Sequence, residues 1–161
     1  MDKDQVAIAR IIRASEIAQA RGMGPLYVGY SGGKDSTVLA DLAIRAGVPI
    51  EIAHSHTTID APETVYFVRR EMARFEACGN AKCTVHMPRY KGKPISMWTL
   101  IPQKLMPPTR VVRYCTSVLK QSHSAGRFSL TGVRWDESVR RKKKHAVYLR
   151  HHTGTRKNGC A

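Results

Sequence analysis

The residues best suited to chemistry lie in a short segment that begins apolar and ends in glycine, serine and lysine, Tyr27 to Ser36 (YVGYSGGKDS). Gly32 and Gly33 can adopt positive φ and bring backbone N–H groups close to a ligand, and a helix after them would add the positive end of its dipole. The polar groups of the segment are Ser31, Lys34, Asp35 and Ser36. The pattern predicts a phosphate-binding loop, and the alternative is a turn that needs glycine only for its geometry.

Two histidines and a glutamate occur at and after a predicted strand over residues 49–54. His54 and His56 alternate, and without a third ligand such a pair is more often explained by hydrogen bonding, so we predict no metal site. Glu63 follows Pro62, which suits the first turn of a helix. The Glu63 carboxylate could either cap that helix or contact a nucleotide.

The segment 110–120 is basic and contains a cysteine, with two arginines ahead of Cys115 and Lys120 after it. At a junction between a loop and a helix, such charges would lower the pKa of the Cys115 thiol and hold phosphate groups. The alternative is a buried cysteine surrounded by solvated arginines.

A further polar segment, 134–141, follows a predicted core strand over 128–133. Ligands of open parallel sheets bind at the carboxyl ends of the strands, so we expect this segment to reach the same site. Its candidate residues are Arg134, Glu137, Ser138 and Arg140. The alternative is an ordinary polar loop that opens a helix, and the basic block 140–144 is typical of a solvated run.

All of these groups depend on alternating strands and helices for their positions. A helix is predicted over 4–21, with an apolar face of Ile8, Ile11, Ile12 and Ala18. Further helices are predicted over 37–46, from 62 onward, and within 88–108. Strands are predicted over 26–30, 49–54, 83–87 and 128–133, with an edge strand at 146–149. Strand, helix and strand in under about thirty residues favour a parallel sheet.

The 161 residues, 42% of them hydrophobic, are enough for one domain with a core and too few for two. We expect a single domain over 1–150 and a disordered basic tail over 151–161. Four scattered cysteines, and no apolar run long enough for a membrane span or a secretory signal, favour a cytoplasmic protein. The formal net charge of +15 predicts a polyanionic partner, either nucleic acid or nucleotide, unless the surface is simply basic.

The loop at 31–36 resembles the Ser-Gly-Gly-x-Asp-Ser loop of the PP-loop superfamily, whose members bind adenine nucleotides and often split ATP between its α and β phosphates. Together with the segments 57–63, 113–120 and 132–140, it resembles the ordered motifs of phosphoadenosine phosphosulfate reductase family proteins. The resemblance implies a three-layer α/β fold, adenine nucleotide alpha-hydrolase-like and Rossmann-like, with five mostly parallel strands and helices on both faces.

The resemblance also implies roles for single residues. The implied nucleotide-binding residues are Ser31, Gly32, Gly33, Lys34, Asp35, Ser36, Asp60 and Glu63. The implied sulfate- or phosphate-binding residues are Arg113, Lys120, Arg134 and Arg140. The candidate catalytic residues are Lys34, Arg134 and Cys115. Iron–sulfur members of the family carry a paired cysteine, whereas Thr116 follows Cys115 here, so no iron–sulfur cluster is expected.

Three functions fit these residues. The first is an enzyme of sulfur metabolism that acts on an adenylyl sulfonucleotide or on ATP, with Mg²⁺ expected if ATP is the ligand. The second is an ATP pyrophosphatase-type enzyme of DNA or RNA sulfur modification, in which the basic tail docks the nucleic acid. The third is a shortened, non-catalytic nucleotide-binding member of the family.

Overall fold

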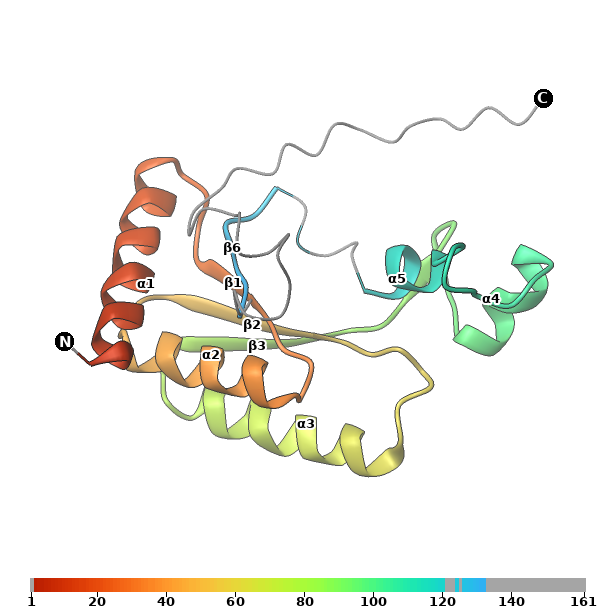
Figure 1. Cartoon of the computed structure of the whole chain (residues 1–161), viewed down its shortest axis with the longest axis horizontal. Coiled ribbons are helices and arrows are strands. Elements are labelled where there is room, and N and C mark those ends of the chain that lie inside the picture. Colours follow the sequence, from red (N-terminus) through yellow and green to blue (C-terminus); the bar gives the residue numbers. More distant parts are fainter. Residues whose placement is uncertain (1, 121–123, 125, 133–161) are drawn as a thin grey trace.

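The structure of the protein is a computed structural model that describes residues 2–120, 124 and 126–132. The predictions for 134–144, for the edge strand at 146–149 and for the tail at 151–161 lie outside the described residues. Helices and parallel strands alternate along most of the described chain, which confirms the predicted α/β class (Figure 1). None of the described helices is both long and apolar enough to span a membrane.

Four parallel strands form the main sheet, in the order β3-β2-β1-β6. These strands are β1 (Leu26–Gly29), β2 (Ile50–Ser55), β3 (Ala81–His86) and β6 (Ser129–Leu130). Each overlaps a strand predicted from the sequence. Because the fifth predicted strand falls outside the described residues, the described sheet has four strands rather than the expected five.

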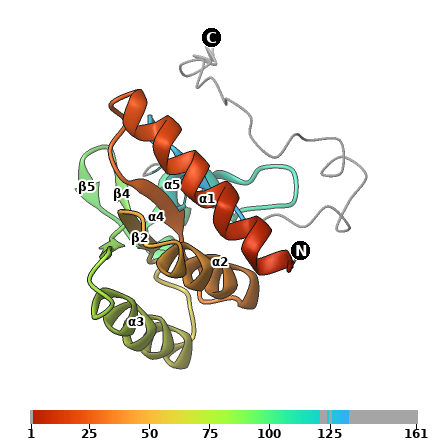
Figure 2. The same cartoon turned by 90° about the vertical axis from the view of Figure 1, so that its left-hand side faces the viewer.

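Three helices line one face of this sheet, α1 (Lys3–Ala20), α2 (Lys34–Arg45) and α3 (Pro62–Glu76). Helix α2 lies between α1 and α3, and α1 packs on α2 while running steeply across its direction (Figure 1 and Figure 2). Right-handed crossovers explain why α2 and α3 share a face, since each connects neighbouring parallel strands in the same direction across the sheet. A second helical layer on the opposite face, which the family resemblance implies, stays a prediction.

The main core lies between the sheet and this helical layer. Leu26, Val28 and Ile52 are fully buried on the strands. The helices contribute small side chains to the same cluster, Ala14, Ala18, Ala40 and Ala43. Small residues at these positions let the α1 and α2 backbones approach the sheet, so the core is filled by branched strand residues against helical alanines.

The buried face of α1 shares Ile11 and Ala18 with the predicted one and differs from it at the other positions. Ile12 was expected on that face, but its side chain is 39% exposed, so this prediction is wrong. The buried positions are Ile11, Ala14, Ser15 and Ala18. They follow the helical spacing i, i+3, i+4 and i+7, and the residue after Ile11 is turned by about 100° around the helix axis, onto its flank.

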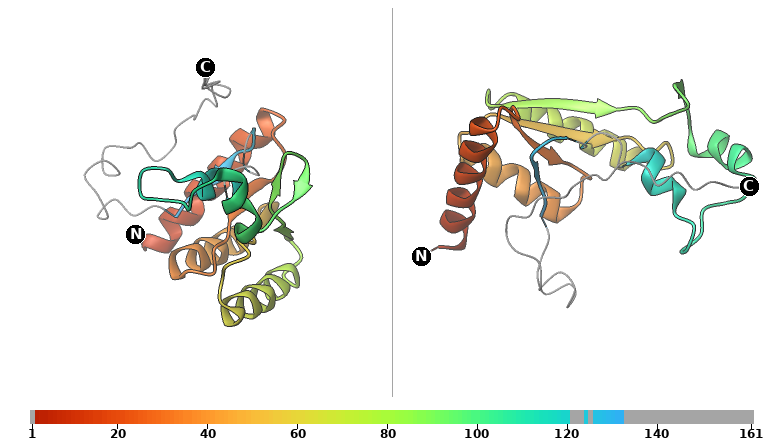
Figure 3. Two further views of the ribbon diagram at one scale, coloured as in Figure 1. Left: turned by 90° about the vertical axis from the view of Figure 1, so that its right-hand side faces the viewer. Right: turned by 90° about the horizontal axis from the view of Figure 1, so that it is seen from above.

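A second, smaller core lies beyond the carboxyl ends of β2 and β3 (Figure 3). It is built by a hairpin and two helices, β4 (Arg89–Tyr90), β5 (Lys93–Pro94), α4 (Met97–Lys104) and α5 (Tyr114–Leu119). Its buried centre consists of Ile95, Met97, Leu100 and Leu119. Helix α4 confirms the short helix predicted within 88–108, and α5 confirms the junction between loop and helix predicted within 110–120.

The hairpin of β4 and β5 precedes α4, in the range 88–108 where the sequence predicted only a helix. Lys91 and Gly92 connect the two strands, and both have positive φ, 51° and 79°. Such two-residue turns match the right-handed twist of the strands they join. Lys104 of α4 donates a hydrogen bond from Nζ to the Tyr90 hydroxyl at 2.9 Å, which fastens the hairpin to the helix.

A partly buried ion pair holds the short strand β6 in the sheet. Arg127 donates two hydrogen bonds to the Glu51 carboxylate on β2, and the Nη1–Oε1 distance is 2.9 Å. The Arg127 guanidinium also lies 4.8 Å from the centre of the Tyr27 ring on β1. These hydrogen bonds hold the pKa of the Glu51 carboxyl below its ordinary value. Since β6 pairs with β1 at only two positions, we infer that the Arg127–Glu51 pair supplies much of its attachment.

Replacing Arg127 with glutamine should lower the free energy of unfolding by about 1–2 kcal/mol at pH 7. Because the folded pKa of Glu51 is depressed, its contribution is present above the unfolded carboxyl pKa of about 4.3 and is lost as the pH falls through the folded value. Urea unfolding between pH 7 and about pH 3 should therefore show a gap between wild type and R127Q that narrows toward acid. The control R13Q, which removes the exposed Arg13–Glu16 pair, should stay within about 0.5 kcal/mol of wild type. A gap that is equally small for both variants at pH 7 would contradict the role of Arg127.

Candidate functional site

The loop between β1 and α2 is closed by the hydroxyl groups of two serines. Ser36 donates from Oγ to the Gly33 carbonyl oxygen at 2.8 Å and accepts from the Ser31 N–H at 3.3 Å. The Ser31 and Ser36 hydroxyl oxygens lie 3.1 Å apart. The Gly33 N–H donates to Ser31 Oγ at 3.4 Å. The predicted order of strand, loop and helix is confirmed, and the loop is a compact turn at the carboxyl end of β1.

Helix α2 begins at Lys34, immediately after the two glycines. Gly33 is its N-cap residue and provides no side-chain cap. N–H groups in the first turn of a helix lack partners within the helix, and the helix dipole adds positive potential there. Lys34 is exposed, and within the described part of the chain it forms no ion pair. The loop therefore presents N–H groups, hydroxyl groups and an ammonium group, a set that suits a phosphate.

Packing against α3 requires glycine at position 32, whether or not a ligand binds the loop. Its φ is +78°, and a Cβ at this position would lie 2.8 Å from Cγ2 of Val68 on α3. Val68 is 1% exposed in the main core, so it has little room to move away. Glycine at position 32 thus lets the loop lie directly against α3. This packing is enough to explain the glycine by geometry alone, and it is also compatible with phosphate binding.

The carboxyl end of β6 lies beside the same loop. A Cβ at Gly132 would be 3.2 Å from the carbonyl oxygen of Asp35, in the first turn of α2. The described part of the strand predicted over 128–133 is therefore followed by a residue that lies next to the start of α2. Arg134 and Arg140, which were predicted to reach the site from this strand, lie outside the described residues.

Tyr30, the residue before the loop, is held by β2 through both of its backbone polar groups. Its N–H donates to the Ala53 carbonyl oxygen at 2.8 Å, and its carbonyl oxygen lies 2.9 Å from Nδ1 of His54. His54 is 7% exposed, so this ring is part of the framework that positions the loop. The prediction that the histidine pair serves hydrogen bonding is confirmed for His54.

Asp60 lies in the segment that follows β2. It accepts hydrogen bonds at Oδ2 from the Thr57 hydroxyl at 2.6 Å and from the Thr57 N–H at 3.3 Å. Burial by itself would raise the pKa of Asp60, but the Thr57 hydrogen bonds and the charges of His54 and Lys120 together bring that pKa below its ordinary value. Asp60 is therefore an anion at neutral pH, suited to a cation or to hydroxyl and amino groups of a ligand. Glu63 is exposed in the first turn of α3, where both of its suggested roles stay open.

Helix α5 brings a basic residue toward the segment that follows β2. Lys120, which follows α5, lies near enough to Asp60 for its charge to lower the Asp60 pKa. Arg113 stands exposed at the other end of the helix, as its N-cap residue. Cys115 is half-buried against the smaller core, with Sγ 4.0 Å from the Thr116 hydroxyl. This packing matches the buried-cysteine alternative, and a catalytic role for Cys115 stays a prediction.

The structure thus brings the loop, Asp60 and Lys120 together around the carboxyl ends of β1 and β2. Glu63 and Arg113 are exposed. Three residues gain a specific role in the structure: His54 as a support of the loop, Thr57 as the partner of Asp60, and Gly132 beside the first turn of α2. The sequence pointed to His54 through its spacing from His56, and to Thr57 and Gly132 only as the first residues of the motif segments 57–63 and 132–140.

A hollow of about 440 Å³ lies elsewhere, among side chains of α1, α2 and α3. Its lining includes Asp4 and Arg45, which already form an ion pair with an Nη1–Oδ2 distance of 2.9 Å. The hollow is open, and Arg45 in its lining pairs with both Asp4 and Asp41. We therefore assign the candidate site to the strand ends and the loop, where the glycines, hydroxyl groups and Lys34 meet.

The family model of the phosphoadenosine phosphosulfate reductase domain matches residues 25–157. The chain belongs to this family. The family is part of the PP-loop superfamily, whose members bind adenine nucleotides, and the matched range contains the loop, the exit of β2 and helix α5. No protein of curated function shows significant sequence similarity to the chain.

Among solved structures, the chain is similar to the NH3-dependent NAD synthetase from Campylobacter jejuni subsp. jejuni NCTC 11168 in complex with the nitrate ion. The two share 19% sequence identity with a TM-score of 0.46. The similarity covers 69% of this chain and 44% of the synthetase chain. This chain therefore spans less than half the length of the synthetase.

Replacing Gly32 with alanine should destabilise the protein more than the same change at Gly47. Both glycines have positive φ, but a Cβ at Gly47 would have no atom within 4 Å, whereas at Gly32 it would collide with Val68. We expect a loss of about 1 kcal/mol for G47A from the backbone alone. For G32A we expect about 2–4 kcal/mol, because overpacking adds to the backbone cost. Equal losses in urea unfolding would show that α3 does not press on the loop.

Proposed function

We propose that this chain is a PP-loop enzyme that binds an adenine nucleotide at residues 31–36 and acts on an adenylyl sulfonucleotide or on ATP. The observation that carries the proposal is the glycine loop at the end of β1, with two serine hydroxyls and Lys34 at the start of α2. Membership of the phosphoadenosine phosphosulfate reductase domain family supports the same ligand class.

In this proposal the loop holds the phosphate groups. N–H groups at the start of α2 donate to phosphate oxygens. The Ser31 and Ser36 hydroxyls add further hydrogen bonds when they turn from their contacts within the loop toward the ligand. Lys34 adds a positive charge where negative charge develops on phosphoryl or sulfonyl oxygens during transfer. The backbone contacts of Tyr30 with β2 keep these donors in place before the ligand arrives, which lowers the cost of binding.

Acidic and basic residues around the loop bind the other parts of the ligand. Asp60 and Glu63 accept hydrogen bonds from the nucleoside side, while Arg113 and Lys120 hold a terminal sulfate or phosphate. Arg134 and Arg140 are proposed to join them. If ATP is the ligand, Mg²⁺ accompanies its phosphates, and Asp35 in the first turn of α2 supplies a carboxylate for the metal or its water.

Replacing Lys34 with alanine should weaken nucleotide binding while leaving the fold intact. A charge-assisted contact is worth about 1.5–3 kcal/mol, so the dissociation constant should rise roughly tenfold to a hundredfold. Lys3 begins α1 as Lys34 begins α2, so K3A is the matched control and should bind as wild type does. Isothermal titration gives the affinities, and thermal unfolding confirms that both variants are folded. Unchanged nucleotide affinity in K34A would reject the loop as the phosphate site.

The choice of nucleotide is decided by titrating the wild-type protein with ATP plus Mg²⁺, with adenylyl sulfate and with its 3′-phosphorylated form. Selective binding of a sulfonucleotide supports the role in sulfur metabolism. Selective binding of ATP, with pyrophosphate released when DNA or RNA is added, supports the nucleic-acid modification enzyme. Nucleotide binding without turnover of any of these compounds supports a non-catalytic member of the family.

A further inference from the structure

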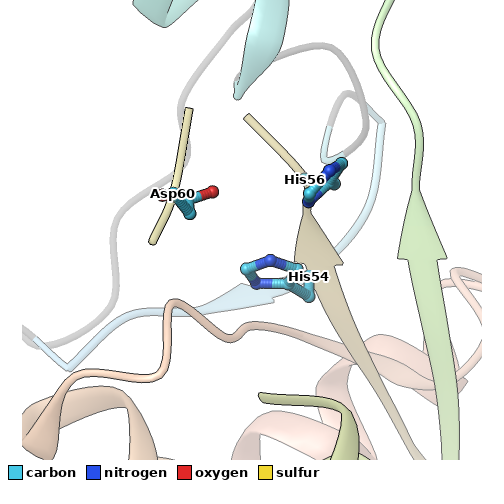
Figure 4. A group of neighbouring side chains, drawn as sticks. All are labelled: His54, His56 and Asp60. Atoms are coloured by element: carbon cyan, nitrogen blue, oxygen red, sulfur yellow. The ribbon is translucent and has the colours of Figure 1, made fainter. Parts of the chain in front are cut away.

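We infer that His54, His56 and Asp60 form a binding site for a divalent transition-metal ion of the Zn²⁺ type. One potential ligand atom from each residue lies within 4.8 Å of the other two. Figure 4 shows the two imidazole rings at the end of β2 and the Asp60 carboxylate across from them. The metal site shares Asp60 with the proposed nucleotide site and uses none of the groups of the phosphate loop, so a loss of metal binding and a loss of phosphate binding can be told apart.

The arrangement arises from the path of the chain after β2. His54 and His56 are two residues apart, and the His56 N–H donates to the His86 carbonyl oxygen at 2.9 Å, which continues the pairing with β3. In extended chain, residues at this spacing point to the same side. Thr58 then takes a positive φ of 68°, and its hydroxyl accepts from the Met97 N–H at 2.9 Å. This turn, fixed by the start of α4, brings Asp60 back toward the two rings.

The His54 ring is prepared for a metal by its contact with Tyr30. Nδ1 lies 2.9 Å from the Tyr30 carbonyl oxygen, an acceptor, so Nδ1 carries the ring proton and donates. The lone pair of the neutral ring is then on Nε2. Metal-binding histidines commonly donate their other ring N–H to a carbonyl or carboxylate in this way, which fixes both the tautomer and the orientation of the ring.

Asp60 is likewise held in the form that binds a metal. Both hydrogen bonds from Thr57 end on Oδ2, so they orient the carboxylate and leave Oδ1 for a cation. The charge of Lys120 acts nearby and opposes a cation, and the negative charge of Asp60 offsets it.

The ligand types favour Zn²⁺ and related ions over Mg²⁺ and Ca²⁺. Two imidazole nitrogens and one carboxylate oxygen suit borderline metals, whereas hard cations prefer oxygen ligands throughout. Ligand atoms around a tetrahedral zinc lie about 3.3 Å apart, so small side-chain rotations would close the present separation. Three protein ligands leave a fourth position open for water or for an oxygen atom of a ligand.

The test is a titration of the full-length, chelator-treated protein with Zn²⁺, read by competition with a chromophoric chelator, and with Co²⁺, read by visible absorption. We expect one Zn²⁺ per chain that H56A and D60N each weaken by at least about tenfold. Mg²⁺ in excess should not displace it. The same Zn²⁺ should raise the thermal unfolding temperature of wild type more than that of either variant.

Other histidines and cysteines in the chain provide the controls. H151A/H152A removes a histidine pair outside the described residues, and C78S removes an exposed thiol. Both should keep the wild-type Zn²⁺ affinity. Circular dichroism identifies any variant that fails to fold. If H56A fails to fold, the Zn²⁺ affinity of D60N, which preserves side-chain size, decides the test. Wild-type affinity in D60N and H56A, loss of binding in a control variant, or no Zn²⁺ binding by wild type would each overturn the inference.

Discussion

In the parallel pairing of β1 with β2, Leu26 lies opposite Ile50 and Gly29 lies opposite Ala53, so both strands end at one edge of the sheet. The pairing continues one residue further, because both backbone polar groups of Tyr30 are engaged by β2 or its His54 side chain. The glycine loop starts at the next residue. The loop follows β1 in the sequence, but the position of its first residue is therefore fixed by hydrogen bonds to β2.

The same register determines what surrounds the loop. Helix α3 follows β2 and presses Val68 against Gly32, while β6 on the other side of β1 brings Gly132 to the first turn of α2. The strand β6 is short and depends on the Arg127–Glu51 pair, which spans β1 from one neighbouring strand to the other. The loop thus lies among parts of the chain that are distant in the sequence and that the sheet brings together.

The smaller core contacts the segment that follows β2. Helix α4 begins with a backbone N–H that holds Thr58, and Lys120 after α5 acts on the charge of Asp60. The segment between β2 and α3 is therefore fixed from both sides, by the end of the sheet and by the hairpin-and-helix unit. This explains how a polar loop can keep two imidazole rings and a carboxylate within a few ångströms of one another.

The sequence alone determined the features that rest on local patterns. The glycine loop, the alternation of strands and helices, and the start of α3 at Pro62 depend on neighbouring residue types and periodicity, and the structure confirms each of them. The family resemblance, carried by the same short motifs, is confirmed as well.

Only the tertiary structure decided the contacts between distant residues. Arg127 and Glu51 are 76 positions apart, and their pairing leaves no local pattern in the sequence. The buried position of Ser15 in place of Ile12 depends on how α1 is rotated against its neighbours. Asp60 joins His54 and His56 because Thr58 turns the chain and Met97 of α4 holds that turn. Periodicity reports which face of an element is apolar, whereas these positions depend on how separate elements pack.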